Sequence, residues 1–108
     1  MLLPATFHIL MALADGDRHG YAIIQDVGAR TRGAVRLSAG TLYRTLQRLL
    51  EQGLIVEVDE RPEPEMDDER RRYYRLTRAG REAAESETTR LATLVKLARA
   101  RGLSTGRA

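Results

Sequence analysis

The pattern of apolar and polar residues divides the chain into four helical stretches and one pair of short strands. Apolar residues at positions i, i+3, i+4 and i+7 share one face of a helix, so this spacing predicts helices with one buried side. It favours helices at residues 4–14, 20–29 and 78–101, and a further helix at 38–53, a range that includes the two capping residues. Runs at 54–59 and 73–76 favour two strands joined by a long polar loop. The resulting order is helix, helix, helix, hairpin, long helix.

The first two helices are expected to supply core residues. The first repeats apolar side chains at Leu3, Phe7, Leu10, Met11 and Ala14, and the second at Tyr21, Ile24 and Val27, with Ile23 as a further candidate. The first stretch also imitates the apolar part of a signal peptide. No basic segment precedes it and His8 interrupts it, so a core helix is favoured. No run approaches the ~18 apolar residues of a membrane span.

The third helix has two boundary signals and two distinct faces. Ser38 is suited to cap its first turn, and Gly53 stands where a left-handed residue would end it. Its buried stripe is Leu42, Leu46, Leu49 and Leu50. The opposite face carries Gly40, Arg44, Gln47, Arg48 and Glu51, flanked by Thr41 and Tyr43. Arginine and glutamine read base edges in DNA, but a surface helix with a merely solvated polar face remains the alternative.

Composition narrows the function classes. The 108 residues fit one small core, and without cysteine the two histidines lack partners at ligand spacing, so we expect neither a metal nor a cofactor. Residues 57–69 carry a local charge of −7, which leaves +10 on the rest of the chain, and 17 of the 18 basic residues are arginine. Nucleic acid is therefore the favoured partner. No convergent acid, base and nucleophile point to an enzyme, and the composition suits the cytoplasm.

The last helix is expected to mediate self-association. Thr77 is suited to cap it, Gly102 to end it, and its second half carries an apolar stripe at Leu91, Leu94, Val95 and Ala98. A second copy of the chain is the favoured partner for that stripe, because two-fold homodimers are the commonest assemblies, and packing back on its own domain is the alternative. We therefore divide the chain into a DNA-binding domain at 1–77, a dimerisation helix at 78–102 and a frayed tail at 103–108.

Four strings of the sequence resemble the PadR family of bacterial transcriptional regulators. They are H-G-Y-A-I from His19, S-A-G-T-L-Y from Ser38, L-Q-R-L-L-E-Q-G-L-I from Leu46 and R-R-R-Y-Y-R-L-T-R-A-G from Arg70. The resemblance covers about residues 5–84. The short C-terminal part is similar to the family's compact subgroup, in which a single terminal helix mediates dimerisation. The resemblance implies a winged helix-turn-helix domain, homodimerisation and repression at a palindromic operator, often released by a small molecule. Ala39 and Arg44 depart from prolines that the family often has, and Arg44 adds a cation that faces the groove.

These observations lead to named site residues. Arg44, Gln47 and Arg48 are predicted to contact base edges, and Gly40 lies on the same face; the predicted contacts to the DNA backbone are Ser38, Thr41, Tyr43, Arg71 and Arg72. For Tyr43 the alternative is a ring packed under the hairpin, and for residues 70–72 it is ion pairs with Asp67, Asp68 or Glu69. His19 is expected to pack or cap rather than act as a base. A winged-helix module that binds another protein is the competing function.

Overall fold

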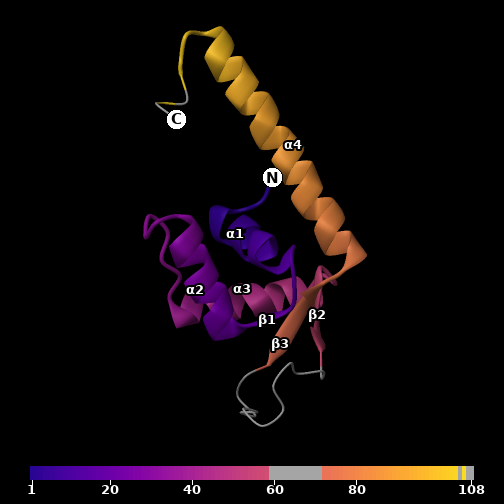
Figure 1. The fold of residues 1–108 in the computed structure, drawn as a ribbon. Coiled ribbons are helices and arrows are strands. Elements are labelled where there is room, and N and C mark those ends of the chain that lie inside the picture. The colour runs from indigo at the N-terminus through magenta and orange to yellow at the C-terminus, as the bar shows by residue number, and fades with distance from the viewer. Residues whose placement is uncertain (59–71, 105, 107–108) are drawn as a thin grey trace.

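A computed structural model describes residues 1–58, 72–104 and 106, which form a helical body, a small sheet and one long helix (Figure 1). The helices are α1 (Pro4–Leu13), α2 (Gly20–Arg30), α3 (Ala39–Glu51) and α4 (Arg78–Ala100). The strands are β1 (Arg18–His19), β2 (Ile55–Val58) and β3 (Tyr73–Leu76). Every predicted helix and strand is present, with ends that differ by one or two residues, as is usual for such boundaries. The mainly α, winged helix-turn-helix fold is confirmed.

The sheet contains one strand that the sequence did not predict. β3 is central in an antiparallel sheet of order β1-β3-β2, and Ile55 pairs with Leu76 at one end of the β2–β3 hairpin. We call this hairpin the wing. β1 adds the pairs Arg18–Tyr74 and His19–Tyr73 on the other side of β3. Two residues are too few to show the alternation by which a strand is recognised in a sequence.

The core lies where α1, α2, α3 and the sheet meet, and the predicted stripe of α3 forms its centre. The fully buried large side chains are Ile9, Leu10, Ile23, Val27, Leu42, Leu46, Leu49 and Ile55. In α3 the prediction is confirmed for three leucines, and Leu50 packs at the edge of the core. Buried Tyr74 reaches the same core from β3.

The predicted buried faces of α1 and α2 were partly wrong. Of the residues predicted for the buried face of the first helix, Leu3, Met11 and Ala14 are exposed, whereas Ile9 and Leu13 of α1 are buried. α1 contacts α2, α3 and α4, so apolar residues surround most of it and periodicity does not single out one face. In α2 Tyr21 is 60% exposed and Ile23 takes the buried position, because the side of the helix that packs against the body is the one that carries Gly20, Ile23 and Val27.

The start of α4 is attached directly to the end of α3. Gly53 has φ +72° and ends α3 as predicted, and its carbonyl oxygen accepts a 2.8 Å hydrogen bond from the Thr77 hydroxyl. The Thr77 N–H donates to the Leu54 carbonyl, and the Thr77 side chain caps α4 through the Gly80 N–H. A Cβ on Gly80 would overlap the Leu54 carbonyl oxygen. The close approach of Gly80 to Leu54 and the hydrogen bonds of Thr77 therefore fix α4 to the α3–β2 turn.

A second attachment joins α4 to the N-terminal segment. Glu87 is only 4% exposed; its carboxylate accepts a 3.2 Å hydrogen bond from the Leu2 N–H and a 3.0 Å hydrogen bond from Arg90 Nε. The Arg90 hydrogen bonds, with help from Leu2, lower the pKa of Glu87 to about 2. Beyond this point α4 extends away from the body, which gives the molecule a longest dimension of 54 Å (Figure 1).

Candidate nucleic-acid interface

The outer side of α3 is a polar surface held in place by the buried side. Leu42, Leu46 and Leu49 anchor the helix in the core, and rotation by 100° per residue then turns Arg44, Gln47 and Arg48 outward. All three outward side chains are exposed. Within the described residues Arg44 and Arg48 form no ion pair, so both guanidinium groups are available to a ligand.

The first turn of α3 is organised by its cap. The Ser38 hydroxyl oxygen accepts a hydrogen bond from the Thr41 N–H at 3.1 Å, and the two side-chain hydroxyls lie 3.1 Å apart within hydrogen-bonding distance. The predicted cap is thus confirmed. Gly40 is exposed with open space around its Cα, so a phosphate or base edge can approach the backbone closely there. Gln47 donates to Glu51 at 3.4 Å, a long contact that a base can replace.

Tyr43 lies at the edge of this surface and reaches toward the start of α2. Its side chain is about half exposed, and a Cβ placed on Gly20 would lie 2.7 Å from its hydroxyl oxygen. Gly20 therefore leaves the room in which the Tyr43 hydroxyl rests. Both readings of Tyr43 find support, because the ring also lines the space beneath the wing while the residue stays accessible.

On the wing, the predicted contact residue Arg72 has an ion-pair partner that was not predicted. Arg72 pairs with Glu57 across the hairpin at 3.3 Å, and both side chains are exposed. The expected partners Asp67, Asp68 and Glu69 lie outside the described residues, as does the predicted contact Arg71. An exposed pair of this kind contributes little to stability, so Arg72 can exchange Glu57 for a phosphate at low cost.

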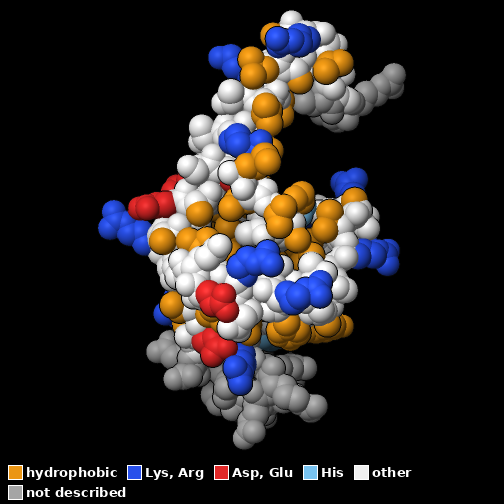
Figure 2. Space-filling view, turned by 180° about the vertical axis from the view of Figure 1, so that it is seen from behind, with side chains coloured by type: hydrophobic (Ala, Val, Ile, Leu, Met, Phe, Trp, Pro, Cys, Tyr) orange, Lys and Arg blue, Asp and Glu red, His pale blue; other side chains and the backbone are white. Residues whose placement is uncertain are grey.

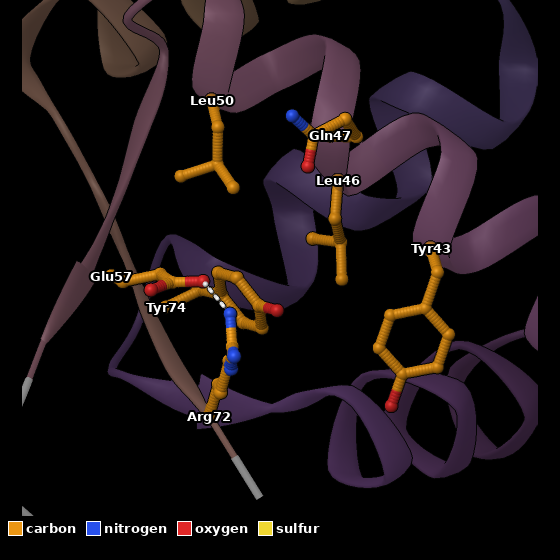
Figure 3. Close-up of a pocket in the computed structure, with 7 residues that line it drawn as sticks. All are labelled: Tyr43, Leu46, Gln47, Leu50, Glu57, Arg72 and Tyr74. Atoms are coloured by element: carbon orange, nitrogen blue, oxygen red, sulfur yellow. Dashed lines mark hydrogen bonds and ion pairs between the residues drawn. The ribbon is translucent and has the colours of Figure 1, made fainter. Parts of the chain in front are cut away.

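A cavity of about 450 Å³ separates α3 from the wing (Figure 3). Tyr43, Leu46, Gln47 and Leu50 line it from α3, and Glu57, Arg72 and Tyr74 line it from the wing. Glu57 and Tyr74 were not among the site residues predicted from the sequence. They belong to different strands and meet as a cross-strand pair only through the register of β2 on β3. Alternation along β3 is the one signal in the sequence that could have placed Tyr74 on the core side.

His19 has the structural role that was expected of it. Its Nδ1 accepts a hydrogen bond from the Ala22 N–H and caps α2, and its ring packs edge-on against Tyr73 with centroids 5.3 Å apart. The motif around His19 thereby holds the first turn of α2 beside β3 and next to Tyr43. It positions the candidate interface without taking part in it.

The predicted dimer stripe is left uncovered along α4. Leu94 is 47% exposed and Val95 41%, while Leu91 and Ala98 are partly exposed. Figure 2 shows apolar side chains following α4 where it stands clear of the body. The alternative, packing of the stripe back on its own domain, is therefore absent from the described fold. Leu97, also about half exposed, widens the apolar surface beyond the four predicted residues.

Two further classes of site are missing from the part of the chain that the structure describes. No group of three or more histidine, cysteine, aspartate or glutamate side chains is placed to hold a metal ion there. No helix among those residues is long and apolar enough to cross a membrane.

Three helices, the third with an exposed polar face, together with a β-hairpin wing define a winged helix-turn-helix protein. The model of the PadR-like family of transcriptional regulators matches residues 9–86, and the chain belongs to this family. The resemblance that the four strings predicted is thus confirmed. Members of the family are transcriptional regulators and not enzymes.

Individual proteins agree with this assignment. The transcriptional regulator Rv3488 of Mycobacterium tuberculosis is 38% identical over 89 residues, which span 82% of this chain and 77% of the relative. A PadR family transcription regulator from Clostridium difficile R20291 is 27% identical with a TM-score of 0.71, covering 87% and 93% of the two chains. Bacillus subtilis PadR, solved in complex with operator DNA, shares the fold with a TM-score of 0.66 at 19% identity. That match covers 79% of this chain and 46% of the other.

Proposed function

We propose that this transcription regulator binds DNA in a sequence-specific manner, with α3 in the major groove and the wing against the flanking backbone. The observation that carries the proposal is the outer face of α3, where Arg44, Gln47 and Arg48 are exposed while three buried leucines fix the helix. Bacillus subtilis PadR, which has the same fold, was solved with operator DNA. The proposed site of action of the present chain is the cytoplasm, where operator DNA lies.

The roles of the contact residues follow from their chemistry. Arg44, Gln47 and Arg48 are proposed to read base edges, since arginine and glutamine form paired hydrogen bonds to guanine and adenine. The proposed backbone contacts are Ser38, Thr41, Tyr43, Arg71 and Arg72, with Gly40 allowing close approach. In this proposal residues 1–77 form the DNA-binding domain and the tail at 103–108 takes no part.

The proposed active form is a homodimer that represses at a palindromic operator. Leu91, Leu94, Val95 and Ala98 form the self-interface, because an apolar stripe on a helix that leaves the body needs a partner to cover it. A two-fold symmetric pair presents two copies of α3, and such a pair matches an operator with two inverted half-sites. Release by a small molecule is also part of the proposal.

The test begins with operators selected from fragments of the source genome by the purified protein. Affinity for a selected duplex should fall steeply between about 50 and 200 mM salt, because several phosphates are neutralised on binding. A protein-interaction module with the same fold would select no sequence and show a flat salt response. That result would overturn the DNA-binding proposal.

A further inference from the structure

Glu57 places a negative charge inside the proposed DNA surface. It stands opposite Tyr74 in the register of β2 on β3, and directly opposed residues share one face of a sheet. Arg72 lies two positions before Tyr74 and therefore continues on that face. Figure 3 shows the carboxylate and the guanidinium meeting beside the Tyr74 ring, across the cavity from Gln47. A surface proposed to bind phosphates thus holds an acid against its wing cation.

The ion pair between these two side chains is long and accessible. Arg72 Nη1 lies 3.3 Å from Glu57 Oε1, whereas charge-assisted hydrogen bonds usually measure about 2.7–2.9 Å. The side chains of Arg72 and Glu57 are 65% and 42% exposed. Among the described residues no second acid pairs with Arg72. A phosphate oxygen can therefore approach the guanidinium from solvent and take the place of the carboxylate.

The pair also decides where the surface attracts DNA. Of the described residues that line the cavity, Glu57 is the one acid and Arg72 the one base, so their charges cancel. Arg44 and Arg48 on α3 form no ion pair within the described residues, and their charges are not cancelled. Attraction of phosphates over a distance follows the uncompensated charges. It therefore comes from the helix proposed to read bases, while the charge of the wing cation is masked.

We propose that Glu57 is an internal competitor of the DNA backbone, which occupies Arg72 in the free protein and is displaced by a phosphate in the complex. The inference rests on the proposed function, because it requires the wing to meet DNA. Binding then exchanges one ion pair for another, so the gain from the Arg72 contact is reduced by the pair that is lost. Because a phosphate contact carries no sequence information, Glu57 lowers the affinity for operator and unrelated DNA by the same factor.

A double-mutant cycle tests this exchange with Glu57→Gln, Arg72→Ala and the chain that carries both substitutions. Fluorescence anisotropy gives the dissociation constants for a selected operator and for a scrambled duplex at one salt concentration. Glu57→Gln should tighten both complexes, because Arg72 no longer loses a partner on binding and one negative charge is removed. In the Arg72→Ala background the substitution removes the charge alone, so the tightening should be roughly twofold to fivefold smaller. Both side chains are exposed, so neither substitution should unfold the wing.

Glu51→Gln is the matched control. Glu51 is an exposed acid on the outer face of α3, and the hydrogen bond that it accepts comes from Gln47 and not from Arg72. Its effect on affinity should be the same in the two backgrounds, because no ion pair joins it to Arg72. If the effect of Glu57→Gln is also equal in the two backgrounds, or larger in Arg72→Ala, the competitor role is overturned, since Glu57 then acts by its charge alone. Tightening of the operator complex alone overturns it as well, in favour of a base contact near Glu57.

The competitor role and the proposed function fail in different ways. If the chain selects an operator but the cycle shows no coupling between Glu57 and Arg72, the competitor role fails and the proposed function stands. If the chain selects no sequence and binds neither a genomic nor a scrambled duplex, the proposed function fails and the competitor role fails with it.

Discussion

Arg44 and Arg72 are both exposed cations of the proposed DNA surface, but their surroundings differ. Arg44 projects from the outward centre of α3 with no ion-pair partner among the described residues. Arg72 precedes β3 and is held by Glu57. A guanidinium at the centre of a recognition helix reads a base edge, whereas one on a wing meets the backbone. Different responses to substitution are therefore expected.

Arg44→Ala should cost about 1–3 kcal/mol of binding free energy at one operator position and should allow other bases there. Arg72→Ala should weaken all sequences nearly equally and lower the salt slope by about one unit, since a phosphate contact carries no sequence information. Binding to a panel of single-base operator variants at two salt concentrations distinguishes the two. If both variants weakened all operator sequences equally, the placement of α3 in the groove would be contradicted. If neither substitution changed DNA binding, the protein-interaction module would be favoured.

Gly20 determines where the Tyr43 hydroxyl rests. In Gly20→Ala the new Cβ would lie 2.7 Å from that hydroxyl and 3.2 Å from a Leu42 methyl group, so the tyrosine ring must move. We expect lower operator affinity with little loss of fold stability, because the half-exposed ring can swing aside. The control is Gly28→Ala in the same helix, where nothing lies within 4 Å and alanine should stabilise by about 0.5–1 kcal/mol. Unchanged affinity in Gly20→Ala would rule out a DNA contact by Tyr43.

At the scale of elements, α4 is tied to the body at two points of different chemistry. Its first turn is joined to the end of α3 through Thr77 and the close contact of Gly80. About two turns further on, Glu87 joins it to the N-terminal segment through Leu2. The first attachment contains no titratable side chain, whereas the second depends on the ionised carboxylate of Glu87. Acid should therefore loosen only the second.

Glu87 is expected to give the fold an acid-sensitive component. Because its folded pKa of about 2 lies below the usual 4.5, its contribution to stability is complete above pH 4.5 and is lost as the pH falls toward 2. The thermal midpoint should fall over that window in the unaltered chain and fall less in Glu87→Gln. Glu85→Gln, an exposed carboxyl on the same helix, should keep the slope of the unaltered chain. Circular dichroism at fixed protein concentration measures the midpoints, and identical slopes for all three would exclude a stabilising Glu87 contact.

At the scale of the whole molecule, the two proposed tasks, DNA binding and self-association, belong to opposite ends of the structure. The wing and α3 lie at one end of the body, and the uncovered half of α4 extends from the other (Figure 1). Because α4 starts against the end of α3, the angle between two α4 helices in a dimer would set the separation of the two recognition helices. Any change at the proposed dimer interface would therefore reach the DNA surface through the joint at Thr77.

Leu94→Asp should convert the proposed dimer to a monomer. The substitution places a charge in the centre of the apolar stripe, where an unpaired ion is strongly disfavoured once the stripe is covered. Thr89→Asp is the matched control, because it adds the same charge at an exposed position on the far side of α4 and should leave assembly unchanged. Sedimentation velocity gives the masses. A dimer that survives Leu94→Asp would show that a different surface mediates assembly.

The sequence by itself determined the features that depend on neighbours along the chain. The cap at Ser38, the left-handed Gly53 and Gly102, and the leucine stripe of α3 were all predicted, because capping and helical periodicity act within a few residues. The wing strands followed from alternation and β propensity. Most residues of the candidate interface could therefore be predicted from the sequence, since they lie on a single helix.

Only the tertiary structure decided the features that depend on segments far apart in the chain. Strand β1, the exposed Tyr21 and the buried side of α1 follow from what each element packs against, which periodicity does not encode. The bond from Leu2 to Glu87 joins residues 85 positions apart. The cavity around Tyr74 exists because the wing folds back over α3 in one register. Local interactions thus specify the helices and strands, and long-range packing specifies which of their side chains meet.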